Sequence, residues 1–343
     1  MRAALITGVG QLELREFPDP EPSPNGAVVD IAFCGVCGTD LHAFQSGAPY
    51  NPAICGHEWT GTVTSIGREV SRFSEGDRVV VGVPPACGSC DPCQAGQASY
   101  CSTSFLVALG RDPLAPPHGG FAPRIAVGTN RLLPANAALD DETLAQVEPA
   151  AVAFHAVRRS GIRLGDTAVI QGAGPIGLLT LQLVRASGAG EIIVVEPNER
   201  RQNLARELGA NVTVTPAEAE AVTQDRTTGL GADVVYECVG RPETVQDAVD
   251  LVRRGGSVCL IGLSDGDAPI TPRTWLIKEV SVTSAIAYVH EDFEMAMGMM
   301  ADGRVRVGPL HTSTVGLDGL ADALSDLGSG SSEHIKVLVD PHA

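Results

Sequence analysis

Five short apolar runs between residues 167 and 284 constrain the fold more strongly than any other feature of this 343-residue sequence. They read TAVIQ (167–171), EIIVV (191–195), DVVYE (233–237), SVCLI (257–261) and VSVTS (280–284). Helical stretches separate several of them, for example 175–189 and 198–209, the second with Asn198 as its expected N-cap. Continuous apolar strands spaced by helices are typical of a parallel sheet covered on both faces, so the sequence predicts an α/β fold.

The segments on either side of this region have a different pattern. Residues 1 to about 147 contain β-branched runs such as AVVDIAF and GDRVVVG, bounded by Gly, Pro and Asp, which predict a β-rich segment. After about residue 287 we expect helices at 291–302 and 317–327 and a final strand at 335–339. A chain of this length suits two domains better than one core.

The net charge of the chain and its cysteines indicate which kinds of molecule the protein can bind and in which cellular compartment we expect it. The net charge of −17 and the absence of a Lys/Arg-rich run argue against nucleic acid. The only lysines are Lys278 and Lys336, which we interpret as compositional bias without functional weight. The N-terminus lacks the apolar core of a signal peptide, and no apolar run reaches the ~18 residues of a membrane span. We therefore expect a cytoplasmic protein whose closely spaced cysteines bind metal rather than form disulfides.

The glycine-rich stretch VIQGAGPIGLL follows one of the apolar strands and opens a helix. In this context Gly172 makes the tight turn, Gly174 lets the backbone approach a pyrophosphate, and Gly177 packs helix on strand. The helix N-terminus would then face the phosphates. The alternative is an ordinary strand–helix turn, but the strand, the helix and the acid that follows favour a dinucleotide site.

Glu196, at the end of the next strand, indicates which dinucleotide is bound. A carboxylate there can accept from both ribose hydroxyls and would repel a 2′-phosphate, so we expect NAD rather than NADP. The neighbouring Arg200 and Arg201 weaken this discrimination.

A second motif, CGSCDPCQAGQASYC, holds Cys87, Cys90, Cys93 and Cys101. Four thiolates on a Gly/Pro-rich loop complete a tetrahedral shell around Zn²⁺ and leave no position for water or substrate, so this site would be structural. An iron–sulfur cluster would also use four cysteines, but the spacing differs from the common ferredoxin runs. A cytosolic disulfide is the weaker alternative.

A third set of metal-binding side chains is spread along the chain: Cys37, His57, Glu58 and Glu148. A thiolate, an imidazole and a carboxylate make a three-ligand shell with one open position, which is the catalytic kind of zinc site. Spacing alone cannot join residues so far apart, and a lone His or a Glu before Pro is more often structural.

These stretches together resemble the zinc-dependent medium-chain dehydrogenases/reductases of the alcohol dehydrogenase superfamily. The matching runs include CGVCGTDLH, GHEWTGTVTSIG, the four-cysteine lobe, VEPAAVAFHAV, GAGPIG and HIKVLV. The polyol branch, with its sorbitol-, butanediol- and threonine-dehydrogenase-like enzymes, is the most similar. The resemblance implies a GroES-like β-barrel catalytic domain over 1–147 and 288–343, with a structural-zinc lobe at about 85–103. It also implies a Rossmann doubly wound parallel-sheet domain over 148–287.

The resemblance also assigns roles at the catalytic zinc. Cys37 and His57 become zinc ligands, and the third protein ligand is Glu58 or Glu148, since relatives can exchange these roles. Thr39 matches a hydroxyl beside the substrate oxygen, and His42 a solvent-side proton relay. Asp40 is expected to support the site from behind, whereas Cys34 has no coordination position to fill and is interpreted as a small buried residue.

For the cofactor we expect contacts from the glycine-rich turn and from the ends of the following strands. The expected cofactor residues are Gly172, Gly174, Pro175, Ile176, Gly177, Glu196, Arg201, Cys238 and Gly262. Cys238 and Cys259, in strands of buried character, are expected to be chemically inert.

The resemblance is weakest over residues 102–126, which should form a wall of the substrate pocket. Pro123 and Arg124 replace the residues that many relatives carry there. Arg124 would contact a polar substrate or lie on the surface, and we favour the surface because an unpaired arginine is rarely buried.

With this resemblance, the sequence predicts a zinc-dependent oxidoreductase. The oligomeric state is unmarked in the sequence, and the resemblance implies a homodimer or homotetramer. The enzyme would transfer a hydride between a secondary alcohol or polyol (diol, sugar alcohol, cyclitol or amino alcohol) and NAD. The alternatives are a zinc-independent reductase of the same superfamily and a non-catalytic NAD- or zinc-binding protein.

Overall fold

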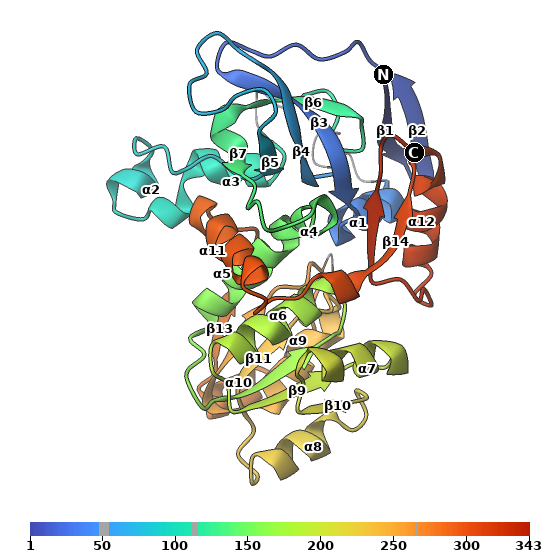
Figure 1. The fold of residues 1–343 in the computed structure, drawn as a ribbon. Helices are drawn as coiled ribbons and strands as arrows, with labels where there is room; N and C mark the ends of the chain where they lie inside the picture. Colours follow the sequence, from blue (N-terminus) through green and yellow to red (C-terminus); the bar gives the residue numbers. More distant parts are fainter. Residues whose placement is uncertain (48–54, 112–115, 265) are drawn as a thin grey trace. The chain divides into compact units, whose positions relative to one another are not determined.

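The computed structural model describes residues 1–47, 55–111, 116–264 and 266–343. The chain forms two compact units (Figure 1). The first comprises Met1–Glu148, Val289–Ala301 and Leu310–Ala343, and the second Pro149–Tyr288 and Asp302–Pro309. Among these residues no helix combines the length and apolar character needed to cross a lipid bilayer.

The second unit is built on a six-stranded sheet in the order β10-β9-β8-β11-β12-β13, with every neighbouring pair parallel. Its strands are β8 (Thr167–Gln171), β9 (Glu191–Val195), β10 (Val212–Val214), β11 (Ala232–Glu237), β12 (Val252–Leu260) and β13 (Ser281–Ser284). The chain runs outward from the central β8 in one direction and then returns to continue in the other, which is the Rossmann order. The predicted parallel sheet is confirmed, and the predicted strands at 167–171 and 191–195 coincide with β8 and β9.

Helices of the second unit connect these strands. They are α6 (Pro175–Ala186), α7 (Glu199–Leu208), α8 (Ala219–Arg226), α9 (Pro242–Leu251) and α10 (Pro272–Lys278), and α5 (Val147–Ser160) leads into the unit. The expected N-cap is confirmed, because the Asn198 side chain accepts a hydrogen bond from the backbone N–H of Arg201. Helix α6 ends three residues earlier than predicted, where Ser187 Oγ donates to the Leu183 carbonyl and Gly188 adopts a positive φ of 88°.

The first unit contains a seven-stranded sheet in the order β14-β15-β3-β4-β5-β7, with β6 paired to β3, and a separate β1-β2 hairpin. Its strands are β1 (Arg2–Gly8), β2 (Gln11–Glu16), β3 (Gly26–Gly35), β4 (Glu58–Ile66), β5 (Arg78–Val81), β6 (Arg124–Gly128), β7 (Leu132–Pro134), β14 (His311–Val315) and β15 (Lys336–Val339). The predicted β-rich character of this segment is confirmed. The last strand pairs with β3, which brings the C-terminal part of the chain beside residues 34 and 35.

Helices surround this sheet: α1 (Gly38–Ser46), α2 (Asp91–Gln94), α3 (Ser102–Ala108), α4 (Asp141–Leu144), α11 (His290–Ala301) and α12 (Leu320–Gly328). The predicted helix at 317–327 is a 3₁₀ turn, Leu317–Gly319, continued by α12. Trp59 of β4 and Leu320 and Leu324 of α12 belong to one buried apolar cluster. This core fixes β3 and β4 side by side as an antiparallel pair (Figure 1).

Candidate active site

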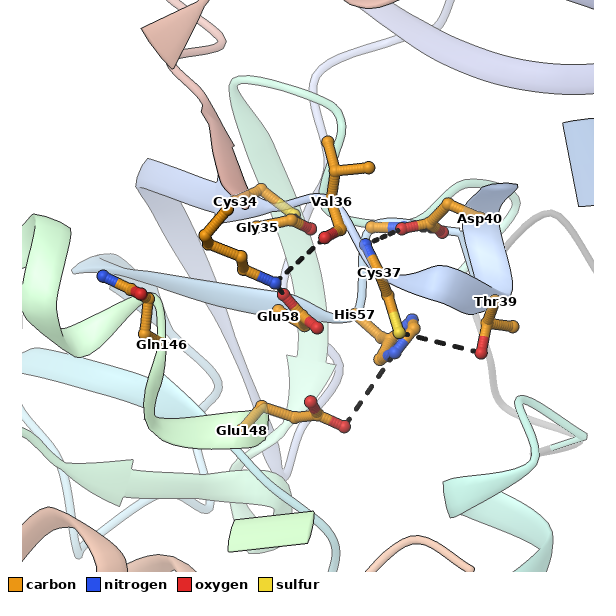
Figure 2. Close-up of polar contacts among 12 residues, drawn as sticks. Cys34, Gly35, Val36, Cys37, Thr39, Asp40, His57, Glu58, Gln146 and Glu148 are labelled. Carbon is orange, nitrogen blue, oxygen red and sulfur yellow. Dashed lines mark hydrogen bonds and ion pairs between the residues drawn. The ribbon is translucent and has the colours of Figure 1, made fainter. Parts of the chain in front are cut away.

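The turn between β3 and α1 sets the position of Cys37. Cys37 is the N-cap of α1, and its backbone N–H donates to Asp40 Oδ2 at 2.8 Å. The other oxygen, Asp40 Oδ1, accepts the backbone N–H of Gly56 at 3.0 Å. Asp40 is completely buried. This single carboxylate therefore ties the turn that carries Cys37 to the turn that carries His57 (Figure 2).

His57 and Glu58 follow at the start of β4, where Glu58 is the register partner of Gly35 in β3. Glu148 comes from the first turn of α5, and its Oε1 lies 3.9 Å from His57 Nε2. Figure 2 shows the Glu148 carboxylate pointing toward His57 and Cys37. Residues more than a hundred positions apart thus meet at one place, which sequence spacing could not establish.

One ligand atom each from Cys37, His57 and Glu58 lies within 4.8 Å of the other two. Ligand atoms on a tetrahedral zinc ion are roughly 3.3–3.8 Å apart, so small side-chain movements would bring these three into a coordination shell. A thiolate, an imidazole and a carboxylate also suit Zn²⁺ chemically. The residues therefore fit a zinc ion, with Glu148 next to the group on its His57 side.

The charged groups at this site favour the binding of a metal cation. Burial raises the pKa of the Cys37 thiol. Burial alone would lower the pKa of His57, but the adjacent Cys37 and Glu148 hold it well above its ordinary value. The histidine is therefore held among negative groups that favour a positive charge, and a bound metal ion can supply that charge in place of a proton.

Thr39 and His42 lie three residues apart on α1, which places them on the same side of the helix. Thr39 Oγ1 is 3.7 Å from Cys37 Sγ. Both side chains are partly buried. Of the two candidate proton-relay residues, Thr39 lies next to the proposed metal ligand Cys37, and His42 lies on the same face of the helix as Thr39.

Lys336 is the residue of this site that sequence reasoning missed. It lies in β15 with 2% of its side chain exposed, forms an ion pair with Glu58 Oε2, and donates to the Val36 carbonyl at 2.9 Å. A Cβ at Gly35 would overlap the Glu58 carboxylate and the end of Lys336, so a larger residue there would have to displace this ion pair. One signal could have found it, namely a lysine inside the apolar run IKVLV in a chain with only two lysines.

The four-cysteine lobe lies in the same unit, beside α2. The ligand atoms of its cysteines are all within 4.8 Å of one another; they are Cys87, Cys90, Cys93 and Cys101. Cys90 is the N-cap of α2, and the backbone N–H of Cys87 donates to Cys101 Sγ at 3.3 Å. Backbone and side-chain donors of Ser89 lower the pKa of Cys87 to about 5, which favours a thiolate. The cysteines are free thiols, so the disulfide alternative has no support here.

The residues expected to bind the cofactor lie on the second unit at the carboxyl ends of β8, β9, β11 and β12. Gly172, with φ of 89°, turns the chain out of β8, and its N–H donates to the Val195 carbonyl at 2.8 Å. A Cβ at Gly177 would strike the Gly172 carbonyl, which explains the close strand–helix packing. Cys238 and Gly262 follow the neighbouring strands, with Cys238 N–H bound to the Gln171 carbonyl at 3.0 Å. In doubly wound sheets this edge is where ligands bind.

Glu196 is almost fully buried at this edge. Its Oε2 accepts from Ala173 N–H at 2.8 Å and its Oε1 from Asn198 N–H at 2.9 Å. The carboxylate thus braces the glycine-rich turn against the start of α7, a role that the sequence did not reveal. Each oxygen keeps a further lone pair that a ribose hydroxyl could use.

Two predictions outside the metal sites are also resolved. Cys34 is fully buried in β3 and belongs to neither group of metal-binding side chains among the described residues, as expected. Arg124 has 44% of its side chain exposed and pairs with Asp19 at 3.2 Å and Asp30 at 3.3 Å, which agrees with the surface interpretation.

Comparison with known proteins agrees with this geometry. Residues 23–137 match the alcohol dehydrogenase GroES-like domain, and residues 175–302 match the zinc-binding dehydrogenase domain. A curated relative, 2-dehydro-3-deoxy-L-galactonate 5-dehydrogenase of Pseudoalteromonas atlantica, is 33% identical, with 100% of this chain and 99% of the relative covered.

Solved structures show the same fold. 2R,3R-butanediol dehydrogenase from Bacillus subtilis superposes with a TM-score of 0.85 at 30% identity, covering 99% of each chain. A protein of Sinorhizobium meliloti 1021 described as a zinc-binding dehydrogenase, bound to NADP, superposes with a TM-score of 0.87 at 32% identity, again covering 99% of each chain. The chain belongs to the zinc-binding alcohol dehydrogenase family, with a GroES-like domain and a Rossmann domain.

The four-cysteine lobe makes a prediction that separates its role from catalysis. Cys90→Ser should remove one metal ion per chain and lower the melting temperature by roughly 5 °C or more, because a structural zinc site contributes folding energy directly. Metal analysis and thermal unfolding measure both effects. Cys34→Ala, which removes a buried thiol outside both groups, is the matched control and should keep its full metal content. A Cys90→Ser variant that melts normally but loses turnover would contradict the structural role.

Proposed function

We propose that the chain is a zinc-dependent oxidoreductase that interconverts a secondary alcohol or polyol and its ketone, with a nicotinamide cofactor. The observation that carries this proposal is the meeting of Cys37, His57 and a carboxylate in a family of dehydrogenases. The four-cysteine lobe is proposed as a second, structural zinc site, which gives two zinc ions per chain. Its shell is complete without substrate, whereas the group at Cys37 leaves a position open.

Alcohol oxidation needs a proton removed from oxygen and a hydride removed from carbon. Zn²⁺ bound at this site would act as a Lewis acid that makes a hydroxyl group acidic near neutral pH, and NAD⁺ would take the hydride to give NADH and a ketone. The chain supplies the position of both groups and the route for the proton.

We assign the protein ligands from the distances. Cys37 and His57 are two of them, and Glu58 is favoured as the third because its carboxylate lies within the 4.8 Å group. Glu148, 3.9 Å from His57, is then placed to orient the histidine and to face the open position. Asp40 keeps the Cys37 turn in place through its two backbone bonds.

Thr39 and His42 are proposed to carry the proton. The Thr39 hydroxyl is next to Cys37 Sγ and can accept a hydrogen bond from a substrate hydroxyl while donating onward. His42, on the same face of α1, suits the exchange step because an imidazole has one nitrogen that can accept a proton and another that can donate one.

The substrate class is inferred from the relatives. One acts at a hydroxyl position of a sugar acid and another on butanediol, by their names, so both handle a carbon that bears a hydroxyl group within a polar chain. We propose a diol, sugar alcohol, cyclitol or amino alcohol for this protein.

NAD is proposed as the preferred cofactor. Glu196 lies at the end of β9, where a carboxylate would repel the 2′-phosphate of NADP. One structural relative is bound to NADP, and Arg200 and Arg201 follow at the start of α7, so the preference is a matter of degree that measurement has to decide.

A homodimer or homotetramer in the cytoplasm is proposed as the working form. Strand β13 is an edge of the six-stranded sheet, and it exposes Val282, with Leu276 and Ile277 of α10 exposed nearby in the sequence. An apolar sheet edge is stabilised when a second copy pairs with it.

Cys37→Ser should lower turnover roughly 100-fold or more across a panel of diols, sugar alcohols and amino alcohols, because the soft ligand of the open site is lost. The variant should keep the zinc of the four-cysteine lobe. Unchanged turnover, or a wild-type protein with one zinc per chain, would favour a zinc-independent reductase instead.

The same panel assayed with NAD⁺ and NADP⁺ tests Glu196. We expect kcat/KM to be higher with NAD⁺, by about tenfold, since one unfavourable carboxylate–phosphate contact is worth about 1.4 kcal/mol. A preference for NADP⁺ would contradict this assignment.

Two glycines of the cofactor turn form a matched pair for binding and folding. A Cβ at Gly174 meets no described heavy atom within 4 Å, so Gly174→Ala should fold normally and weaken NAD⁺ binding by about tenfold, because the methyl occupies the pyrophosphate's approach. A Cβ at Gly177 strikes backbone, so Gly177→Ala should cost about 1–3 kcal/mol of stability. Titration calorimetry and thermal unfolding measure these effects, and normal NAD⁺ affinity in Gly174→Ala would place the pyrophosphate elsewhere.

A further inference from the structure

Lys336 is a buried cation that the reaction described above does not use. Its ammonium is held by one ion pair, to Glu58 Oε2, and one hydrogen bond, to the Val36 carbonyl. Burying a lysine costs free energy unless it is paired, so its place beside the metal ligands needs an explanation.

The ion pair engages one oxygen of a carboxylate that also belongs to the candidate metal group. Lys336 holds Oε2, while a carboxylate oxygen of Glu58 also lies within the 4.8 Å group with Cys37 and His57. Carboxylates bind metal ions through one or both oxygens. The ammonium occupies one lone pair of Oε2 and draws charge toward it, so binding of a metal through both Glu58 oxygens is disfavoured and Oε1 is the stronger ligand.

Charge balance gives Lys336 a second effect on the same site. With a metal bound, Cys37 would be a thiolate and, together with the carboxylates of Glu58 and Glu148, would bring three negative charges close to Lys336. A zinc ion and one ammonium neutralise these three charges. Without the ammonium the loaded site would be one charge more negative and would hold a dication more tightly.

We propose that Lys336 is a positioning residue that keeps Glu58 bound to the metal through one oxygen and so preserves an open coordination position for the substrate. This inference rests on the proposed catalytic metal site. When Lys336 is absent, both Glu58 oxygens can turn to the metal, which binds more tightly but loses its open position.

A lysine suits this task better than the arginine that this chain uses almost everywhere else. Its charge is compact and its stem is slim, which matters beside Gly35, where even a methyl group would collide with Lys336. The guanidinium of an arginine is planar and broader and would grip the carboxylate through both of its oxygens, which would leave neither oxygen free for a metal.

The test replaces the catalytic-site metal by Co²⁺ and compares wild type with Lys336→Met. Visible d–d absorption is stronger for tetrahedral Co²⁺ than for Co²⁺ with more ligands, and the bands lost in Cys37→Ser identify the site. We expect weaker absorption in Lys336→Met and release of Co²⁺ to excess EDTA that is slower by about tenfold or more. Lys278→Met is the matched control: that lysine donates to the Val249, Asp250 and Val252 carbonyls in the other unit, and both readouts should stay at wild-type values.

A second comparison shows whether the effect runs through Glu58. In the Glu58→Gln background position 58 has no carboxylate that could bind through two oxygens, so adding Lys336→Met should change the release rate less than about threefold. This pair also removes the carboxylate that Lys336 neutralises directly, so it serves if Lys336→Met alone folds poorly. Fast metal release in either Lys336→Met variant, with the fold intact by circular dichroism, would overturn the proposal.

Failure of the underlying metal site would look different. In that case wild-type protein would show no cobalt bands sensitive to Cys37→Ser, and the comparison at Lys336 would have no signal to change. Cysteine-dependent bands that are identical in wild type and Lys336→Met would instead keep the metal site and reject the role of Lys336.

Discussion

The arrangement of this molecule depends on concentrating negative charge inside the first unit and compensating it there. A thiol and three carboxyl groups, those of Cys37, Asp40, Glu58 and Glu148, lie around one histidine and are largely withdrawn from water. Two backbone N–H groups satisfy Asp40, and Lys336 pairs with Glu58. The remaining charge is what a divalent metal ion would neutralise, so the fold and the metal site stabilise each other.

The two units contribute different kinds of chemistry. The first fixes side chains by burial and ion pairing at the ends of β3, β4 and β15, where small changes in charge decide how a metal is held. The second works mainly through its backbone, because glycine at 172, 174 and 177 shapes a turn at the carboxyl edge of a parallel sheet. A dehydrogenase needs both kinds of chemistry. Titratable side chains transfer the proton, and the glycine-rich turn at the carboxyl edge of the parallel sheet binds the cofactor.

How much the sequence could predict follows from the range of the interactions. The strands and helices of the Rossmann unit, the cap at Asn198 and the four-cysteine lobe depend on residues close in sequence, and those patterns were readable. The group around Cys37 joins residues 37, 57, 58 and 148, which only the tertiary fold brings together; the family resemblance supplied that connection. The role of Lys336 cannot be predicted from the sequence, because no residue near it in the sequence indicates that β15 pairs with β3 beside Gly35. The sequence predicts that Glu196 binds a ribose of the cofactor. In the structure its carboxylate also accepts two backbone hydrogen bonds that hold the glycine-rich turn in place.

We propose that one chain holds two metal sites: an open site with mixed ligands and a closed site with four thiolates. Anomalous diffraction at the zinc absorption edge, from crystals of the purified protein, tests it most directly. We expect two zinc peaks per chain. The first lies among the four cysteines Cys87, Cys90, Cys93 and Cys101. The second lies in contact with Cys37, His57 and a single oxygen of Glu58. A single peak in the cysteine lobe, with no density of a metal at Cys37, would contradict this proposal.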